Sequence, residues 1–98
     1  MVLRGAPHVI LAHAPGDYAW GQTDCVIALT YLELAAAARG LGTCWAGLLT
    51  RAVATDAPLI EALRLPEGHT VHGGLMVGWP KYRYQLVPPR NALQASWL

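Results

Sequence analysis

The sequence has little charge of either sign, only two cysteines and no long uncharged hydrophobic run, and each shortage excludes a class of protein. Lysine, arginine, aspartate and glutamate make up 13% of the 98 residues, the net charge is +1, and the cations are scattered. Nucleic-acid surfaces cluster lysine and arginine against phosphates, so no such surface is predicted. The longest apolar-rich stretch, residues 25–38, contains Glu33. It is shorter than the roughly 18 residues that indicate a membrane span.

The cysteines, Cys25 and Cys44, are too few for a secreted disulfide scaffold and favour a reducing, cytoplasmic environment. Residues 1–7 lack a basic region followed by a sustained apolar core, so no secretory signal is predicted. More than half of the residues are apolar, which at this length predicts one compact domain over residues 1–98. The expected partners are small molecules or another protein.

Three short apolar runs predict β-strands. HVILAHA, residues 8–14, follows a proline and precedes the turn signal APGD. TCWAGLL, residues 43–49, predicts the second strand. The third lies in GHTVHGGLMVGWP, residues 68–80, where it is interrupted by two glycines and ended by Pro80.

Two segments predict helices. The first begins at Thr23 or Asp24, because either side-chain oxygen can accept from free amides of the first turn. It runs to about Arg39, and Gly40 can take the left-handed conformation that ends a helix. The second covers residues 55–65. With three strands and an extended tail over residues 81–98, this order predicts an α+β fold, although a parallel βαβ unit fits it as well.

The first helix has few polar positions to face water, so it is expected to be buried nearly all round. A domain this small can hardly surround one helix with its own atoms. Part of the cover is therefore expected from a partner subunit or from a segment outside the chain. The alternative is a central core helix of a monomer.

Candidate chemistry is sparse. His69 and His72 have a ligand-like spacing, but positions three apart on a strand point to opposite faces, so no metal site is predicted. Cys44 has no base or positive dipole nearby in the sequence, and is interpreted as a small buried side chain. No residue is predicted to be catalytic.

The tail begins with KYRYQLVPPR, residues 81–90, in which cations alternate with tyrosines. This alternation fits an RNA-binding strand, but an edge strand without any ligand gives the same pattern and is preferred. Arg90 follows two stiff prolines, which would present its guanidinium in a geometry suited to phosphate. A solvated tail arginine is the alternative.

The order of three segments carries a family resemblance: LRGAPHVILAHAP, then TDCVIALTYLELAAAARGLGTCWAGLL, then LRLPEGHTVHGGLMVGWPKYRYQLVPPR. It resembles the C-terminal half of the nitroreductase family. GLGTCWAG and GLMVGWPKYRY, followed by PPR, are the most specific pieces and look most similar to the branch that carries an N-terminal iron–sulfur ferredoxin domain. The resemblance implies an α+β fold with a mostly antiparallel sheet, a domain-intertwined homodimer, and FMN bound at the dimer interface.

The resemblance also implies a reaction and a set of contacts. Electrons or hydride would pass from NAD(P)H or another donor to a nitro compound, a quinone or a related acceptor. By position, Trp45, Ala46, Gly47 and Leu48 would line the approach of the backbone to the flavin ring, with Gly47 allowing the main chain close enough to donate hydrogen bonds. Arg90 matches an arginine that contacts the FMN phosphate.

The sequence departs from the family pattern in three ways. Pro88 stands where the family often has a lysine, which would weaken the phosphate contact. The N-terminal segment that holds the FMN phosphate and ribityl chain is missing from these residues, as is a cysteine series for an iron–sulfur cluster. The chain is therefore expected to be a truncated nitroreductase-like domain. A second hypothesis is a noncatalytic dimeric interaction module, a descendant that has lost its flavin.

Overall fold

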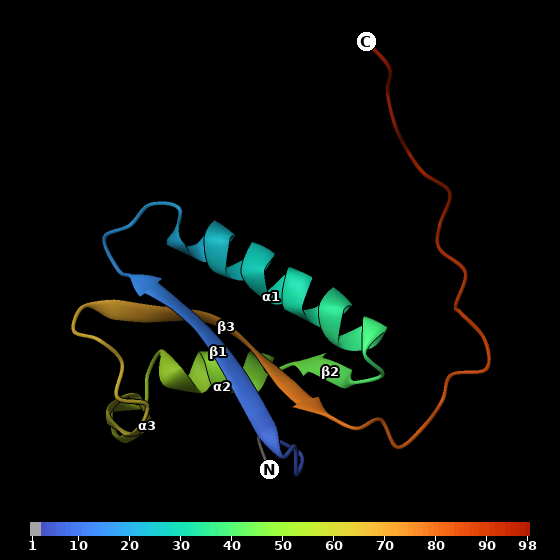
Figure 1. Cartoon of the computed structure of the whole chain (residues 1–98). Helices are drawn as coiled ribbons and strands as arrows, with labels where there is room; N and C mark the ends of the chain where they lie inside the picture. The colour runs from blue at the N-terminus through green and yellow to red at the C-terminus, as the bar shows by residue number, and fades with distance from the viewer. Residues whose placement is uncertain (1–2) are drawn as a thin grey trace.

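A three-stranded sheet with helices on both faces is the framework of the chain (Figure 1). The computed structural model describes residues 3–98. Its elements are β1 (His8–Pro15), α1 (Gly21–Ala38), β2 (Gly42–Trp45), α2 (Gly47–Val53), α3 (Ala57–Ala62) and β3 (His69–Gly78).

The last strand in the sequence lies in the middle of the sheet. The spatial order is β1-β3-β2, and β3 pairs antiparallel with both neighbours. Leu75 of β3 lies between Ile10 of β1 and Trp45 of β2, and its side chain is 0% exposed. The predicted α+β fold is thus confirmed, and the parallel βαβ alternative is wrong.

The centre of β3 contains two adjacent glycines, which carry no side chain. A Cβ on Gly73 would lie 2.8 Å from Leu29 Cδ1 of α1, and a Cβ on Gly74 would lie 2.7 Å from Leu11 Cδ2 of β1. Real Cβ atoms do not come so close, so these glycines allow large side chains to pack directly on the strand. They do not interrupt the strand, contrary to the sequence prediction, since β3 runs continuously through both.

The start of α1 differs from its prediction. The helix begins at Gly21, ahead of both Thr23 and Asp24, and no side chain caps it. Asp24 instead accepts a hydrogen bond from the Tyr18 hydroxyl at 2.9 Å, and this bond raises the pKa of Tyr18. The C-terminal prediction is confirmed, because Gly40 has a φ of +76° just past the end of the helix.

One side of α1 lies on the sheet and the other faces outward. The inner side includes Cys25, Leu29 and Ala36, all buried. The outer side exposes four large apolar side chains: Val26, Ile27, Tyr31 and Leu34. The chain therefore does not surround its longest helix, as expected, and the alternative of a central core helix in a monomer is wrong.

The segment after β2 folds differently from the prediction. The predicted strand over residues 43–49 ends at Trp45, and the chain turns directly into α2. Leu49 and Val53 lie four residues apart on one face of this helix and pack with Ala46 and Val71 in a small buried cluster. This packing on the face of β3 stabilises a helix where the sequence alone reads as an apolar strand.

The second predicted helix is real but shorter than residues 55–65. Helix α3 covers Ala57–Ala62, and the side chain of Asp56 caps it by accepting from the Leu59 amide at 3.0 Å. The turn after it places Arg64 at a φ of +49°.

The tail from residue 81 to residue 98 contains no regular strand or helix, and the edge-strand interpretation of its first part is wrong. Figure 1 shows it leaving the sheet and running away from the rest of the chain. It remains exposed throughout, including its large apolar side chains. Within residues 3–98, no helix has the length and apolar character needed to cross a bilayer.

Candidate functional site

The junction between β2 and α2 holds four of the five residues predicted to contact a cofactor. Ala46 is buried, and its amide donates to the Gly74 carbonyl of β3 at 2.9 Å. This bond fixes the junction to the central strand. Trp45, Gly47 and Leu48 around it are exposed, Leu48 to 60%.

The backbone amides at the start of α2 have no acceptor within the helix. Helix α2 begins at Gly47, and its N-cap residue Ala46 supplies no side-chain cap. The amides of the first turn of an α-helix have no acceptor within the helix. A Cβ on Gly47 would meet no atom within 4 Å. The main chain at Gly47 is therefore open to a flat ligand that carries acceptor atoms.

Trp45 is fixed by contacts on two sides. Its indole Nε1 donates to Glu33 Oε2 of α1 at 3.0 Å. The ring edge also lies close to β3, with Cζ3 3.3 Å from the position of a Cβ on Gly73. Sequence reasoning did not connect Glu33 with this site. The available signal was a lone carboxylate in the middle of an apolar helix, which needs a partner when it is half-buried.

Arg90 is not brought to this junction within one chain. It lies on the exposed tail, which runs away from the sheet (Figure 1). The structure therefore unites Trp45, Ala46, Gly47 and Leu48, and leaves Arg90 apart from them.

A family model decides the relationship of the chain. The model of the nitroreductase family matches residues 1–79. The chain belongs to the nitroreductase family. No curated protein sequence matches it.

The nitroreductase fold is also found in a solved relative. A crystal structure of a nitroreductase with bound FMN from Bacteroides fragilis is similar to this chain, with a TM-score of 0.71 and 23% sequence identity. The match covers 96% of this chain and 50% of the other, so the present chain spans half the length of that nitroreductase. At this identity the similarity shows the fold alone. The likeness to the ferredoxin-linked branch stays a prediction.

The two thiols of this nitroreductase-family chain occupy opposite environments. Both are free: Cys25 is buried on the inner side of α1, and Cys44 is exposed on β2. The interpretation of Cys44 as a small buried side chain is therefore wrong. Burial raises the pKa of the Cys25 thiol, and the nearby Asp24 carboxylate adds to that shift.

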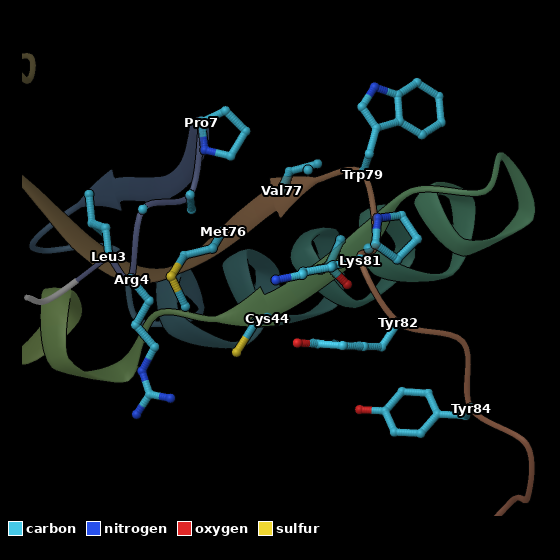
Figure 2. A pocket seen from close by; sticks show the side chains of 16 residues that line it. Leu3, Arg4, Pro7, Cys44, Met76, Val77, Trp79, Lys81, Tyr82 and Tyr84 are labelled. Atoms are coloured by element: carbon cyan, nitrogen blue, oxygen red, sulfur yellow. The ribbon is translucent and has the colours of Figure 1, made fainter.

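Cys44 lines a shallow hollow of about 620 Å³ that sequence reasoning missed. Figure 2 shows the side chains of Tyr82 and Tyr84, at the start of the tail, pointing toward the same space as Cys44. Arg4 and Lys81 also line the hollow. Only the fold could reveal it, because its lining combines residues 3–7, residues 42–44 of β2 and residues 76–84, which are far apart in the sequence.

His69 and His72 do not converge, in agreement with the sequence prediction for residues three apart on a strand. His72 points toward α1, where its Nε2 is buried without a hydrogen-bond partner and lies 3.3 Å from the position of a Cβ on Gly21. His69 instead contacts His13 on β1. Among residues 3–98, no three side chains of His, Cys, Asp or Glu come together in a metal-binding group.

Proposed function

We propose that this chain is the flavin-binding half of an FMN-dependent oxidoreductase that works as a homodimer. The observation that carries the proposal is the open backbone at Gly47, in a chain that belongs to a family with an FMN-bound member of the same fold. Bound FMN would supply the redox chemistry, taking up and passing on hydride or electrons.

The chain's own residues would bind and orient the flavin. The uncapped first-turn amides at Gly47 and Leu48 suit acceptor atoms on the edge of the isoalloxazine ring, which offers nitrogen and carbonyl acceptors. Ala46 holds that backbone in place through its bond to Gly74. Trp45, fixed by Glu33, forms an apolar wall beside the ring. These residues fit the cofactor by their donor set and by the space over Gly47.

Arg90 suits the FMN phosphate of a second copy better than that of its own chain. Its tail extends away from the junction, so reaching its own Gly47 would require the tail to fold back. The outward apolar side of α1 and the exposed apolar tail both support a second copy that covers them. Pro88 in place of a lysine leaves Arg90 as the sole cation of residues 85–98 for this role.

The reaction we propose runs from NAD(P)H or another reductant to a nitro, quinone or related acceptor. No acidic or basic side chain lies among Trp45–Leu48. Protons would therefore come from water or from groups outside this junction. The chain would contribute orientation of the flavin and exclusion of water, not acid–base catalysis.

The test is the visible absorption spectrum of the purified chain before and after addition of FMN, with excess flavin removed by gel filtration. About one retained flavin per chain, as a preformed cofactor site would give, would support the proposal. Oxidation of NAD(P)H above the rate of free flavin would extend it to catalysis. Colourless protein of intact mass after both steps would contradict it.

A noncatalytic dimeric interaction module is the second candidate. It is favoured by one observation: the outer side of α1 exposes large apolar side chains, which a second copy would cover whether or not flavin binds. A stable dimer whose mass, melting temperature and spectrum do not respond to FMN would support this function. Stoichiometric flavin retained through gel filtration would remove it.

A further inference from the structure

Glu33 places a carboxylate between Leu32 and Leu34, in the apolar part of α1. Its side chain is half-buried, and its Oε2 accepts a hydrogen bond from Trp45 Nε1 at 3.0 Å. A half-buried carboxylate without a partner costs free energy, whereas a hydrogen bond to an ionised acceptor is about twice as strong as one between neutral groups. The bond to Trp45 therefore explains how the helix tolerates this charge, and it joins α1 to the end of β2.

The Trp45 ring lies away from Gly47, although only one residue separates the two. No atom of the indole comes within 4 Å of the position that a Cβ on Gly47 would take. The ring edge lies instead beside β3, with Cζ3 3.3 Å from the position of a Cβ on Gly73. The indole is thus held at two points, by Glu33 at its nitrogen and by the glycine of β3 at its opposite edge.

This arrangement orders Trp45 before any ligand binds. The side chain is 40% exposed and stands at the end of an edge strand, where packing alone restricts its rotamers weakly. Ordering a large side chain at the moment of binding lowers affinity. A hydrogen bond that fixes the ring in advance removes that cost.

We propose that Glu33 is a positioning residue of the flavin site, a role that rests on the function proposed above for the β2–α2 junction. Its carboxylate holds the Trp45 indole against β3, so the backbone at Gly47 stays open and the ring is ordered before FMN binds. Because Nε1 already donates to Glu33, the indole offers the ligand an apolar surface without a free donor. Glu33 acts on the flavin through Trp45.

The test is a double-mutant cycle in which FMN affinity is measured by fluorescence quenching of the flavin. Glu33→Ala should bind FMN roughly three- to tenfold more weakly, because binding must then order a free indole. In a Trp45→Phe chain, which lacks Nε1, adding Glu33→Ala should change the affinity by less than about twofold. Equal losses in the two backgrounds would show that Glu33 acts independently of Trp45 and would overturn the proposal.

Two further variants separate the hydrogen bond from the charge. Glu33→Gln keeps an acceptor oxygen at similar reach and should retain FMN affinity within about twofold of the wild type. The matched control is Glu61→Ala, which removes an exposed carboxylate from α3 and should leave the affinity unchanged. A loss in Glu33→Gln as large as that in Glu33→Ala would contradict a positioning role. Glu33→Leu, which suits an apolar helix, replaces Glu33→Ala if that variant does not fold.

The indole NMR signal of the chain without FMN gives a second readout. The Nε1–H resonance of Trp45, assigned by its absence in Trp45→Phe, should lie downfield in the wild type and in Glu33→Gln, and should move upfield in Glu33→Ala. A resonance that does not respond to Glu33→Ala would overturn the contact. Wild-type protein that binds no FMN would refute the flavin function and this role with it. Tight FMN binding that is indifferent to Glu33→Ala would refute only the role of Glu33.

Discussion

Replacing Gly47 with alanine separates a flavin role of the β2–α2 junction from a structural one. The added methyl group meets no atom within 4 Å, and the φ of Gly47 is outside the left-handed region. The fold therefore gives no reason for glycine at the first residue of α2. A nearby flavin would supply one, because the methyl group would occupy the space that the ring needs.

The substitution should change folding stability and FMN affinity in opposite directions. Alanine restricts the unfolded chain and favours helix, so Gly47→Ala should raise the free energy of unfolding by about 0.5 kcal/mol, or roughly 2–4 °C. Losing one or two backbone hydrogen bonds to the flavin should cost about 1–3 kcal/mol of binding, a loss of roughly 5- to 150-fold in FMN affinity.

Gly40 is the matched control. It too has no atom within 4 Å of an added Cβ, but its φ of +76° strains any other residue. Gly40→Ala should therefore lower stability by about 1–2 kcal/mol and leave the affinity of the folded chain for FMN unchanged. Fluorescence quenching of FMN and thermal melting measure both quantities. Unchanged FMN affinity in Gly47→Ala would refute the reasoning.

Three further substitutions and one chemical modification test the fold and the proposed dimer. Leu75→Ala should lower the free energy of unfolding in urea by about 2–5 kcal/mol, because this side chain is fully buried in the central strand. Leu34→Glu, at a side chain that is 66% exposed, should leave the chain folded but dissociate a homodimer in sedimentation experiments. Ala36→Glu buries a charge against the sheet and should unfold the chain. A Leu34→Glu chain that remains dimeric would exclude this face of α1 from the interface. Iodoacetamide at about pH 8 should modify Cys44 at least tenfold faster than Cys25, as followed by mass spectrometry. The reason is that burial raises the pKa of the Cys25 thiol and leaves less thiolate. Equal rates of modification would contradict the burial of Cys25.

Prolines, glycines and turn residues in the sequence predicted where several elements of the fold begin and end. Prolines and turn residues bound the apolar runs that became β1 and β3, and Gly40 marked the end of α1. Helix α2 was not predictable in this way, because seven residues are too few to show helical periodicity within an apolar run. Its helical form depends on Leu49 and Val53 packing on a strand that comes later in the chain.

The candidate site was located by resemblance, and its supporting contacts were not. Glu33 and Trp45 are joined by a hydrogen bond between different elements, which no local pattern encodes. The pairing of His13 with His69 depends on strand register and on a bulge that leaves His72 without a partner on β1. Spacing within one strand correctly separated His69 from His72, but it carries no information about residues on the neighbouring strand.

The central position of β3 also determines when this chain can fold during synthesis. Both β1 and β2 hydrogen-bond to β3 alone within the sheet, yet β3 is the last of the three to leave the ribosome. Until residues 69–78 emerge, the nascent chain carries two unpaired strands and an apolar helix with no sheet beneath it. Such distant pairing slows folding and exposes aggregation-prone edges. A ribosome-bound chain that stops before β3 should therefore be a chaperone substrate, and release of β3 should end that dependence in one step.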